Sequence, residues 1–88
     1  MSEAINGRTN VGYEITDSVH VQDREFVLAY GQDKSSPYVT WECVNGKDYY
    51  FGHYFSNKLN AQRDLINRAN EVMLHLEQMR SSADRGGR

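Results

Sequence analysis

The side chains best suited to chemistry in this sequence are one cysteine and three histidines, Cys43, His20, His53 and His75. A cysteine beside a histidine can form a nucleophile with its general base, and the four together could be metal ligands. A nucleophile also needs a group that orients the base and a site for the oxyanion, and no local motif supplies either. The spacings match neither C-x-x-C nor H-x-x-x-H, which are common in metal sites. We therefore expect no catalytic residue and no metal ligand, and interpret Cys43 as a buried thiol on a core strand.

The glycines do not indicate a cofactor site. Gly31, Gly46 and Gly52 form no phosphate-cradling loop, because none lies between a strand and the start of a helix. They are interpreted as turn and strand-packing residues. Since a domain of this size seldom encloses a pocket large enough for a ligand, we expect no cofactor and no small-molecule ligand. The sequence thus predicts a protein that is not an enzyme.

Composition narrows the possible classes of protein further. The formal net charge of −2 and the pI near 5.8 disfavour a general nucleic-acid binder, which usually has a strong basic excess. The single cysteine leaves no internal disulfide and is typical of a reducing compartment. The opening residues, MSEAINGRTN, contain no apolar run, so neither a signal peptide nor a membrane span is expected there. We expect a cytoplasmic protein with one domain.

Alternation of apolar and polar residues predicts four strands, over 13–21, 25–30, 38–44 and 48–55. The second of these is nearly all apolar, as expected of a strand covered on both faces. The polar residues 1–10 are expected to be a disordered arm, residues 11–80 a single α+β domain, and residues 81–88 a disordered tail. The expected fold is a four-stranded antiparallel meander followed by one amphipathic helix packed on one face.

The helix is predicted where the apolar period changes from two to 3.6 after Phe55. We expect one apolar arc to face the sheet: Leu59, Leu65, Ile66, Ala69, Val72, Met73 and Leu76. A helix that ends near Arg80 would be about 36 Å long, whereas an eight-residue strand spans about 27 Å. The end of the helix should therefore overhang the sheet, and it is a candidate contact surface.

Seven of the ten aromatic residues lie in the stretch YVTWECVNGKDYYFGHYF, residues 38–55, around one Asn-Gly pair. Asn45 and Gly46 predict a two-residue type I′ hairpin loop, which pairs Val44 with Lys47. In that register Trp41 faces the helix, on the side that carries Val39, Trp41, Cys43, Tyr50 and Tyr54. A three-residue loop with a bulge would instead exchange the faces of the last strand and turn its other aromatic residues inward.

With the two-residue loop, four side chains share the open sheet face: Tyr38, Tyr49, Phe51 and His53. An exposed aromatic cluster of this kind commonly marks an interaction site. We expect a protein partner, or a second copy of the chain, to bind this face or the helix overhang. The alternative is an accessory protein that stacks single-stranded nucleic acid on the same residues, although the sheet carries no track of basic side chains for phosphates.

The string PYVTWECVNGKDYYFGHYF, followed by AQRDLINR, resembles a small protein family, without an established activity, found on mobile elements of Gram-positive gut bacteria. The similarity covers Val27 to about Val72. It depends on Tyr38, Val39, Trp41, Gly46, Tyr50, Gly52, His53, Tyr54 and Phe55. The resemblance implies a compact intracellular accessory protein of a conjugative or phage-derived element, and it transfers no catalytic residue.

Overall fold

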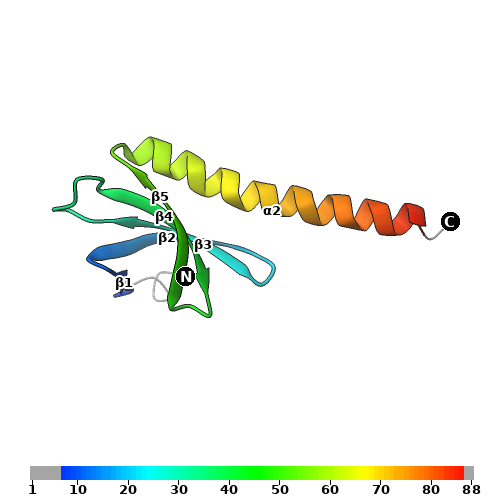
Figure 1. Ribbon diagram of the computed structural model, residues 1–88, viewed down its shortest axis with the longest axis horizontal. Coiled ribbons are helices and arrows are strands. Elements are labelled where there is room, and N and C mark those ends of the chain that lie inside the picture. Colours follow the sequence, from blue (N-terminus) through cyan, green and yellow to red (C-terminus); the bar gives the residue numbers. More distant parts are fainter. Residues whose placement is uncertain (1–6, 87–88) are drawn as a thin grey trace.

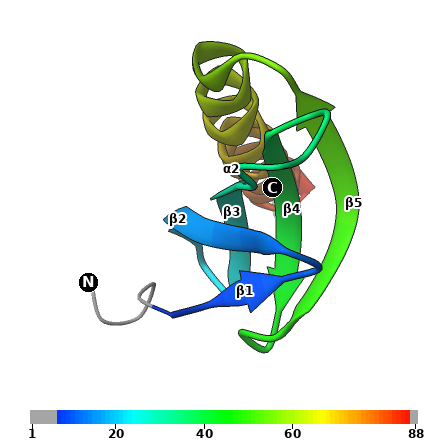
Figure 2. The same ribbon diagram turned by 90° about the vertical axis from the view of Figure 1, so that its left-hand side faces the viewer.

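The computed structural model describes residues 7–86, and side-chain burial as far as Gln78. The elements are β1 (Thr9–Asn10), β2 (Tyr13–Val21), β3 (Arg24–Tyr30), β4 (Tyr38–Val44), β5 (Asp48–Phe55) and α2 (Lys58–Gly86). The five strands form an antiparallel meander in the order β1-β2-β3-β4-β5, curled into a half-barrel, and α2 packs against its outside (Figures 1 and 2). The α+β class, the meander and the C-terminal helix that the sequence predicts are confirmed.

A fifth strand, β1, is the first departure from the prediction. Thr9 and Asn10, which were expected to belong to a disordered arm, pair with Glu14 and Tyr13 at the start of β2. The turn between the two strands places Val11 at φ 44° and Gly12 at φ 87°. A two-residue strand of polar residues has no periodicity to reveal it, so only its partner strand defines it. Residues 1–6 of the expected arm lie outside the described part of the chain.

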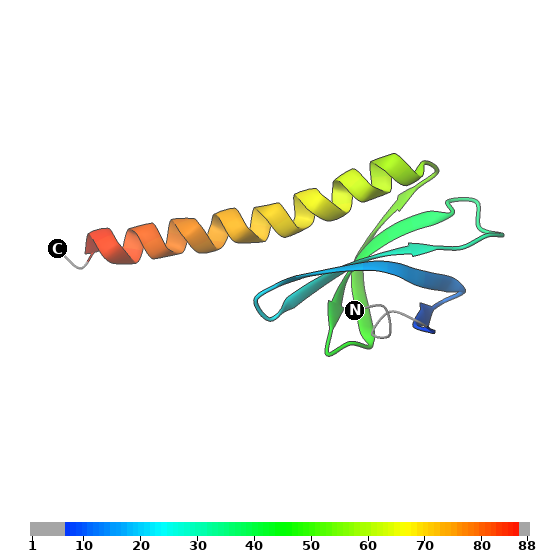
Figure 3. The ribbon, with the colours of Figure 1, turned by 180° about the vertical axis from the view of Figure 1, so that it is seen from behind.

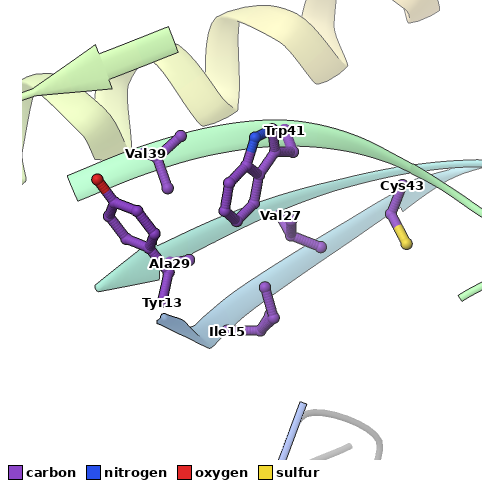
Figure 4. Packing of buried hydrophobic residues seen from close by; sticks show 7 residues of the cluster. All are labelled: Tyr13, Ile15, Val27, Ala29, Val39, Trp41 and Cys43. Carbon is purple, nitrogen blue, oxygen red and sulfur yellow. The ribbon is translucent and has the colours of Figure 1, made fainter. Parts of the chain in front are cut away.

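The curl of the sheet brings strands that are not neighbours into contact across its inner face. The ring of Tyr13 on β2 lies 5.6 Å from that of Trp41 on β4 and 6.3 Å from that of Tyr54 on β5. Figure 4 shows the inner cluster, which consists of Tyr13, Ile15, Val27, Ala29, Val39, Trp41 and Cys43. Tyr49 packs against this cluster. Because the sheet wraps around these side chains, it buries one of its own faces.

The helix covers the opposite, outer face. There the outer cluster joins β2 and β3 to α2 and consists of Val21, Phe26, Leu28, Ala61, Leu65 and Ala69. The expectation that Trp41 lies beneath the helix is therefore wrong. It assumed a flat sheet in which only a helix could bury the Trp41 side, whereas curvature buries that side without one.

The sheet-facing arc of α2 is also rotated from the predicted one. Leu65 and Ala69 are buried as expected, but Leu59, Ile66 and Met73 are exposed on one flank. The helix begins after Asn57, whose side-chain oxygen accepts a hydrogen bond from the backbone N–H of Asn60 at 3.1 Å. Near the start of the helix a small residue, Ala61, faces the sheet and is fully buried.

The helix extends well beyond the sheet (Figure 3). With 29 residues it is about 43 Å long, so residues 81–86 of the expected tail are helical and the predicted overhang is longer than expected. Its last apolar contact described with the sheet is made by Leu76. No helix within residues 7–86 combines the length and apolarity needed to cross a bilayer.

The β4–β5 hairpin has the predicted turn conformation but not the predicted register. Asn45 and Gly46 both have positive φ, 57° and 74°, and the N–H of Lys47 donates to the carbonyl oxygen of Val44 at 3.2 Å. Val44, however, pairs with Asp48 rather than with Lys47, so the loop has three residues. This one-residue shift exchanges the faces of Tyr49 and Tyr50, because successive side chains on a strand point to opposite sides.

Candidate functional site

A second irregularity lies in the middle of β5 and forms the most unusual surface feature of the described chain. Glu42 pairs with Tyr50 and Thr40 with His53, so Trp41 alone opposes both Phe51 and Gly52. This is a β-bulge, and it returns the rest of β5 to the faces that the sequence predicts. At the bulge Phe51 has φ 58° while 72% of its surface is exposed. A bulky side chain rarely adopts this backbone conformation.

Packing of Trp41 explains why residue 52, at the bulge, is a glycine. A Cβ atom on Gly52 would lie 2.9 Å from the indole Nε1 of Trp41 and 3.0 Å from the ring of Tyr54. Glycine therefore lets both rings close over β5 on the inner face. The interpretation of Gly52 as a strand-packing residue is thus confirmed, and the ring that packs on it, Trp41, lies within the half-barrel and not beneath the helix.

Arg68 of α2 holds the bulge from the outer face. Its Nη2 donates to the carbonyl oxygen of Phe51 at 2.8 Å, and its Nη1 donates to the backbone oxygen and hydroxyl of Thr40 at 3.1 and 3.0 Å. One turn earlier, the carboxylate of Asp64 accepts hydrogen bonds from the Thr40 hydroxyl and from Nδ1 of His53, the latter at 2.9 Å. The helix thus holds the backbone of the bulge through polar contacts. The same two side chains, Asp64 and Arg68, supply hydrogen-bond partners for Thr40, which is completely buried.

The four residues expected to share one open face do not do so. Tyr38 is half-buried against the outer cluster, and His53 lies on the same side, paired with Asp64. Tyr49 has moved to the opposite side, where it packs against the inner cluster. Only Phe51 projects fully into solvent. The cause is the pair of register shifts, which turn Tyr49 inward and leave Phe51 at the bulge.

Tyr50 takes the place beside Phe51 that the sequence assigned to Tyr49. The two rings lie 6.2 Å apart, and Tyr50 is about half exposed. We call Tyr50 and Phe51, together with the free edge of β5, the bulge surface. A signal for it was present in the sequence, because a glycine inside an aromatic strand is typical of a bulge.

A second cluster lies at the mouth of the half-barrel, where Arg8 reaches the buried carboxylate of Glu25. Burial alone would raise the pKa of Glu25, but hydrogen bonds from Arg8 and Ser18 outweigh it and hold this pKa below its usual value. Burial, followed by the nearby Glu25 carboxylate, raises the pKa of the Cys43 thiol. A buried thiol with a raised pKa is a poor nucleophile at neutral pH.

Across the described residues, no group of three or more histidine, cysteine, aspartate or glutamate side chains is placed to hold a metal ion. Comparison of the chain with protein-family models, curated proteins and solved structures gives no match. The bulge surface and the Arg8 cluster are thus the features from which a function can be inferred.

Proposed function

We propose that this protein is a non-enzymatic interaction module that binds an extended segment of a partner protein along the free edge of β5. The observation that carries the proposal is Phe51, an exposed aromatic side chain on a strained backbone that Arg68 holds in place. Such strain costs about 1–3 kcal/mol and is most often kept at functional sites. A partner that covers Phe51 and Tyr50 would bury the two rings together.

The edge of β5 suits the addition of a strand. Among the described strands β5 pairs only with β4, so its other side has no strand partner, and Figure 2 shows β5 as the outermost strand at that end of the sheet. Charged residues, proline and β-bulges usually protect edge strands. Of these, β5 has only the bulge at Phe51: from Tyr49 to Phe55 it contains no Asp, Glu, Lys, Arg or Pro, which favours an uncharged, extended peptide as its ligand.

The charges around the bulge surface favour protein over nucleic acid. The two arginines on this face are both engaged: Arg24 donates two hydrogen bonds to the carboxylate of Glu42, each at 2.9 Å, and Arg68 binds backbone oxygens. Phosphates would have to displace these contacts before they could be neutralised. Single-stranded nucleic acid remains the second candidate, supported by the neighbouring rings of Tyr50 and Phe51.

The proposal is tested with a random-peptide phage library selected on the full chain and re-screened against Phe51→Ser. We expect apolar, extended peptides whose binding Phe51→Ser weakens at least about tenfold, which corresponds to about 1.4 kcal/mol. The matched control is Ile66→Ser, which removes a similarly exposed apolar side chain from the flank of α2. Selected peptides that bind Phe51→Ser as tightly as the unaltered chain would overturn the proposal.

Two further measurements separate the alternatives. Light scattering after size exclusion would detect a dimer if a second copy of the chain binds the bulge surface. In that case Phe51→Ser should convert the dimer to a monomer. Fluorescence anisotropy with a labelled single-stranded oligonucleotide would detect the nucleic-acid alternative, whose affinity must fall steeply with added salt. A salt-sensitive complex that requires Phe51, without any peptide selected, would replace our proposal with that alternative.

A further inference from the structure

The segment 7–12, which we call the strap, includes the edge strand β1, and from it the Arg8 side chain reaches the inner side of the sheet. Arg8 Nη1 donates to Glu25 Oε2 at 2.9 Å, and Nη2 donates to Cys43 Sγ at 3.2 Å and to the hydroxyl of Tyr49 at 3.3 Å. The guanidinium carbon lies 5.9 Å from the centre of the Tyr49 ring. One arginine, directly before β1, thus contacts β3, β4 and β5 together.

Several groups besides the Glu25 carboxylate surround that guanidinium. Glu25 is only 7% exposed, and the hydroxyl of Ser18 donates to the same carboxylate oxygen as Arg8. A carboxylate this deeply buried requires a cationic partner, since an unpaired charge there is costly. The face of the Tyr49 ring and the acceptors around it match a planar, delocalised cation.

The strap that delivers Arg8 is held weakly. Its strand contributes two residue pairs, and beyond them the described residues give its backbone a single hydrogen bond, from the N–H of Ile15 to the oxygen of Arg8. Val11, a β-branched residue, has φ 44°, in a region that such residues avoid. In addition, Nε of Arg8 is buried without a hydrogen-bond partner among the described residues. Arg8 therefore fills the site without satisfying every donor of its own.

We propose that the pocket formed by Glu25, Ser18 and Tyr49 is a guanidinium-binding site, which an arginine side chain of a partner protein takes over when the strap detaches. The strap is then an internal occupant that competes with the incoming arginine. The site lies on the inner side of the sheet, away from Phe51. Phe51→Ser should leave arginine binding unchanged, so failure of either proposal can be recognised separately.

The first experiment removes the guanidinium group of Arg8 by mutation and supplies a free guanidinium ion in its place. Arg8→Ala leaves Glu25 without its guanidinium partner and with only His20 Nε2 nearby, 3.8 Å from Oε1. We expect ethylguanidinium at millimolar concentration to raise the melting temperature of this variant. Ethylurea, a neutral analogue of similar shape, and sodium chloride at equal ionic strength should not do so. The double variant Arg8→Ala/Glu25→Gln should show no rescue. An equal response of both variants to ethylguanidinium would overturn the proposal.

The second experiment uses the unaltered chain, so it does not depend on Arg8→Ala being folded. A peptide containing one arginine is compared with the same peptide containing citrulline, by NMR and by hydrogen exchange. We expect only the arginine peptide, and not the citrulline peptide, to shift the resonances of Ser18 and Tyr49. It should also speed hydrogen exchange of the Ile15 amide, because detachment of the strap breaks the hydrogen bond from this amide to the oxygen of Arg8. Identical spectra with the two peptides would show an internal ion pair only, and would overturn displacement of the strap.

Discussion

Arg68 on the helix donates a hydrogen bond at 2.8 Å to the backbone carbonyl oxygen of Phe51, a residue whose own side chain points into solvent. A bulge leaves the backbone groups of its extra residue unpaired by the neighbouring strand. Here a side chain of α2 supplies the missing donor. The position of the helix on the outer face and the conformation of the β5 edge are therefore linked by one guanidinium group.

Replacing Arg68 by alanine should destabilise the protein by about 2–3 kcal/mol, because a charged donor is lost and the fully buried Thr40 loses a partner. Arg63→Ala, on the exposed side of the same helix, should change the free energy of unfolding by less than about 0.5 kcal/mol. Urea denaturation of both variants measures the difference. If Arg68→Ala and Arg63→Ala were equally stable, Arg68 would not hold the bulge.

Phe51→Gly should separate stability from binding. Glycine adopts positive φ without steric cost, and little buried surface is lost, so we expect a gain in stability of up to about 1 kcal/mol. Peptides selected on the unaltered chain should no longer bind. Tyr50→Gly is the matched control, since Tyr50 is not among the residues with positive φ, and it should be destabilising. A loss of stability in Phe51→Gly would contradict the assignment of strain.

Two adjacent leucine-sized residues test which flank of the helix meets the sheet. Leu65 is 5% exposed in the outer cluster, whereas Ile66 is 64% exposed. Leu65→Ala should cost about 2–4 kcal/mol of folding free energy, and Ile66→Ala less than about 0.5 kcal/mol. Thermal unfolding followed by circular dichroism distinguishes the two. The arc read from the sequence places both residues against the sheet and predicts similar losses.

The buried carboxylate of Glu25 should make the fold sensitive to acid. Because its pKa is lower in the folded chain than its ordinary value of 4.5, the unfolded chain takes up the proton first as the pH falls. The stabilisation is complete above pH 4.5 and is lost as the pH decreases through the folded pKa. Glu25→Gln should be less stable at neutral pH but should show a smaller decrease between pH 5 and 3, measured by urea denaturation at each pH.

The elements of this fold can largely be predicted from the sequence, since alternation reveals four strands and the change of period reveals the helix. The curl could not be predicted, because it depends on contacts between strands that are far apart in the sequence, such as Tyr13 with Tyr54. The error about Trp41 follows from this. A pattern of apolar residues shows that a face is buried, but not whether a helix or the sheet itself covers it.

The candidate site could be predicted only in part. Phe51 was correctly placed in solvent, although for a register that does not occur. The contributions of Arg8 and Arg68 could not be anticipated, because each lies in a polar stretch and acquires its role from a partner far along the chain. Periodicity indicates which apolar residues share a buried face, but it does not indicate which charged side chain will bind which backbone oxygen.

Strand β3 contributes Val27 and Ala29 to the inner cluster and Phe26 and Leu28 to the outer one. Strand β3, which is seven residues long, is therefore a common wall between the inner and the outer cluster. Loss of either cluster would expose one apolar face of β3, so we expect the molecule to melt in a single cooperative step. The backbone amides of this wall should be the last to exchange with deuterium.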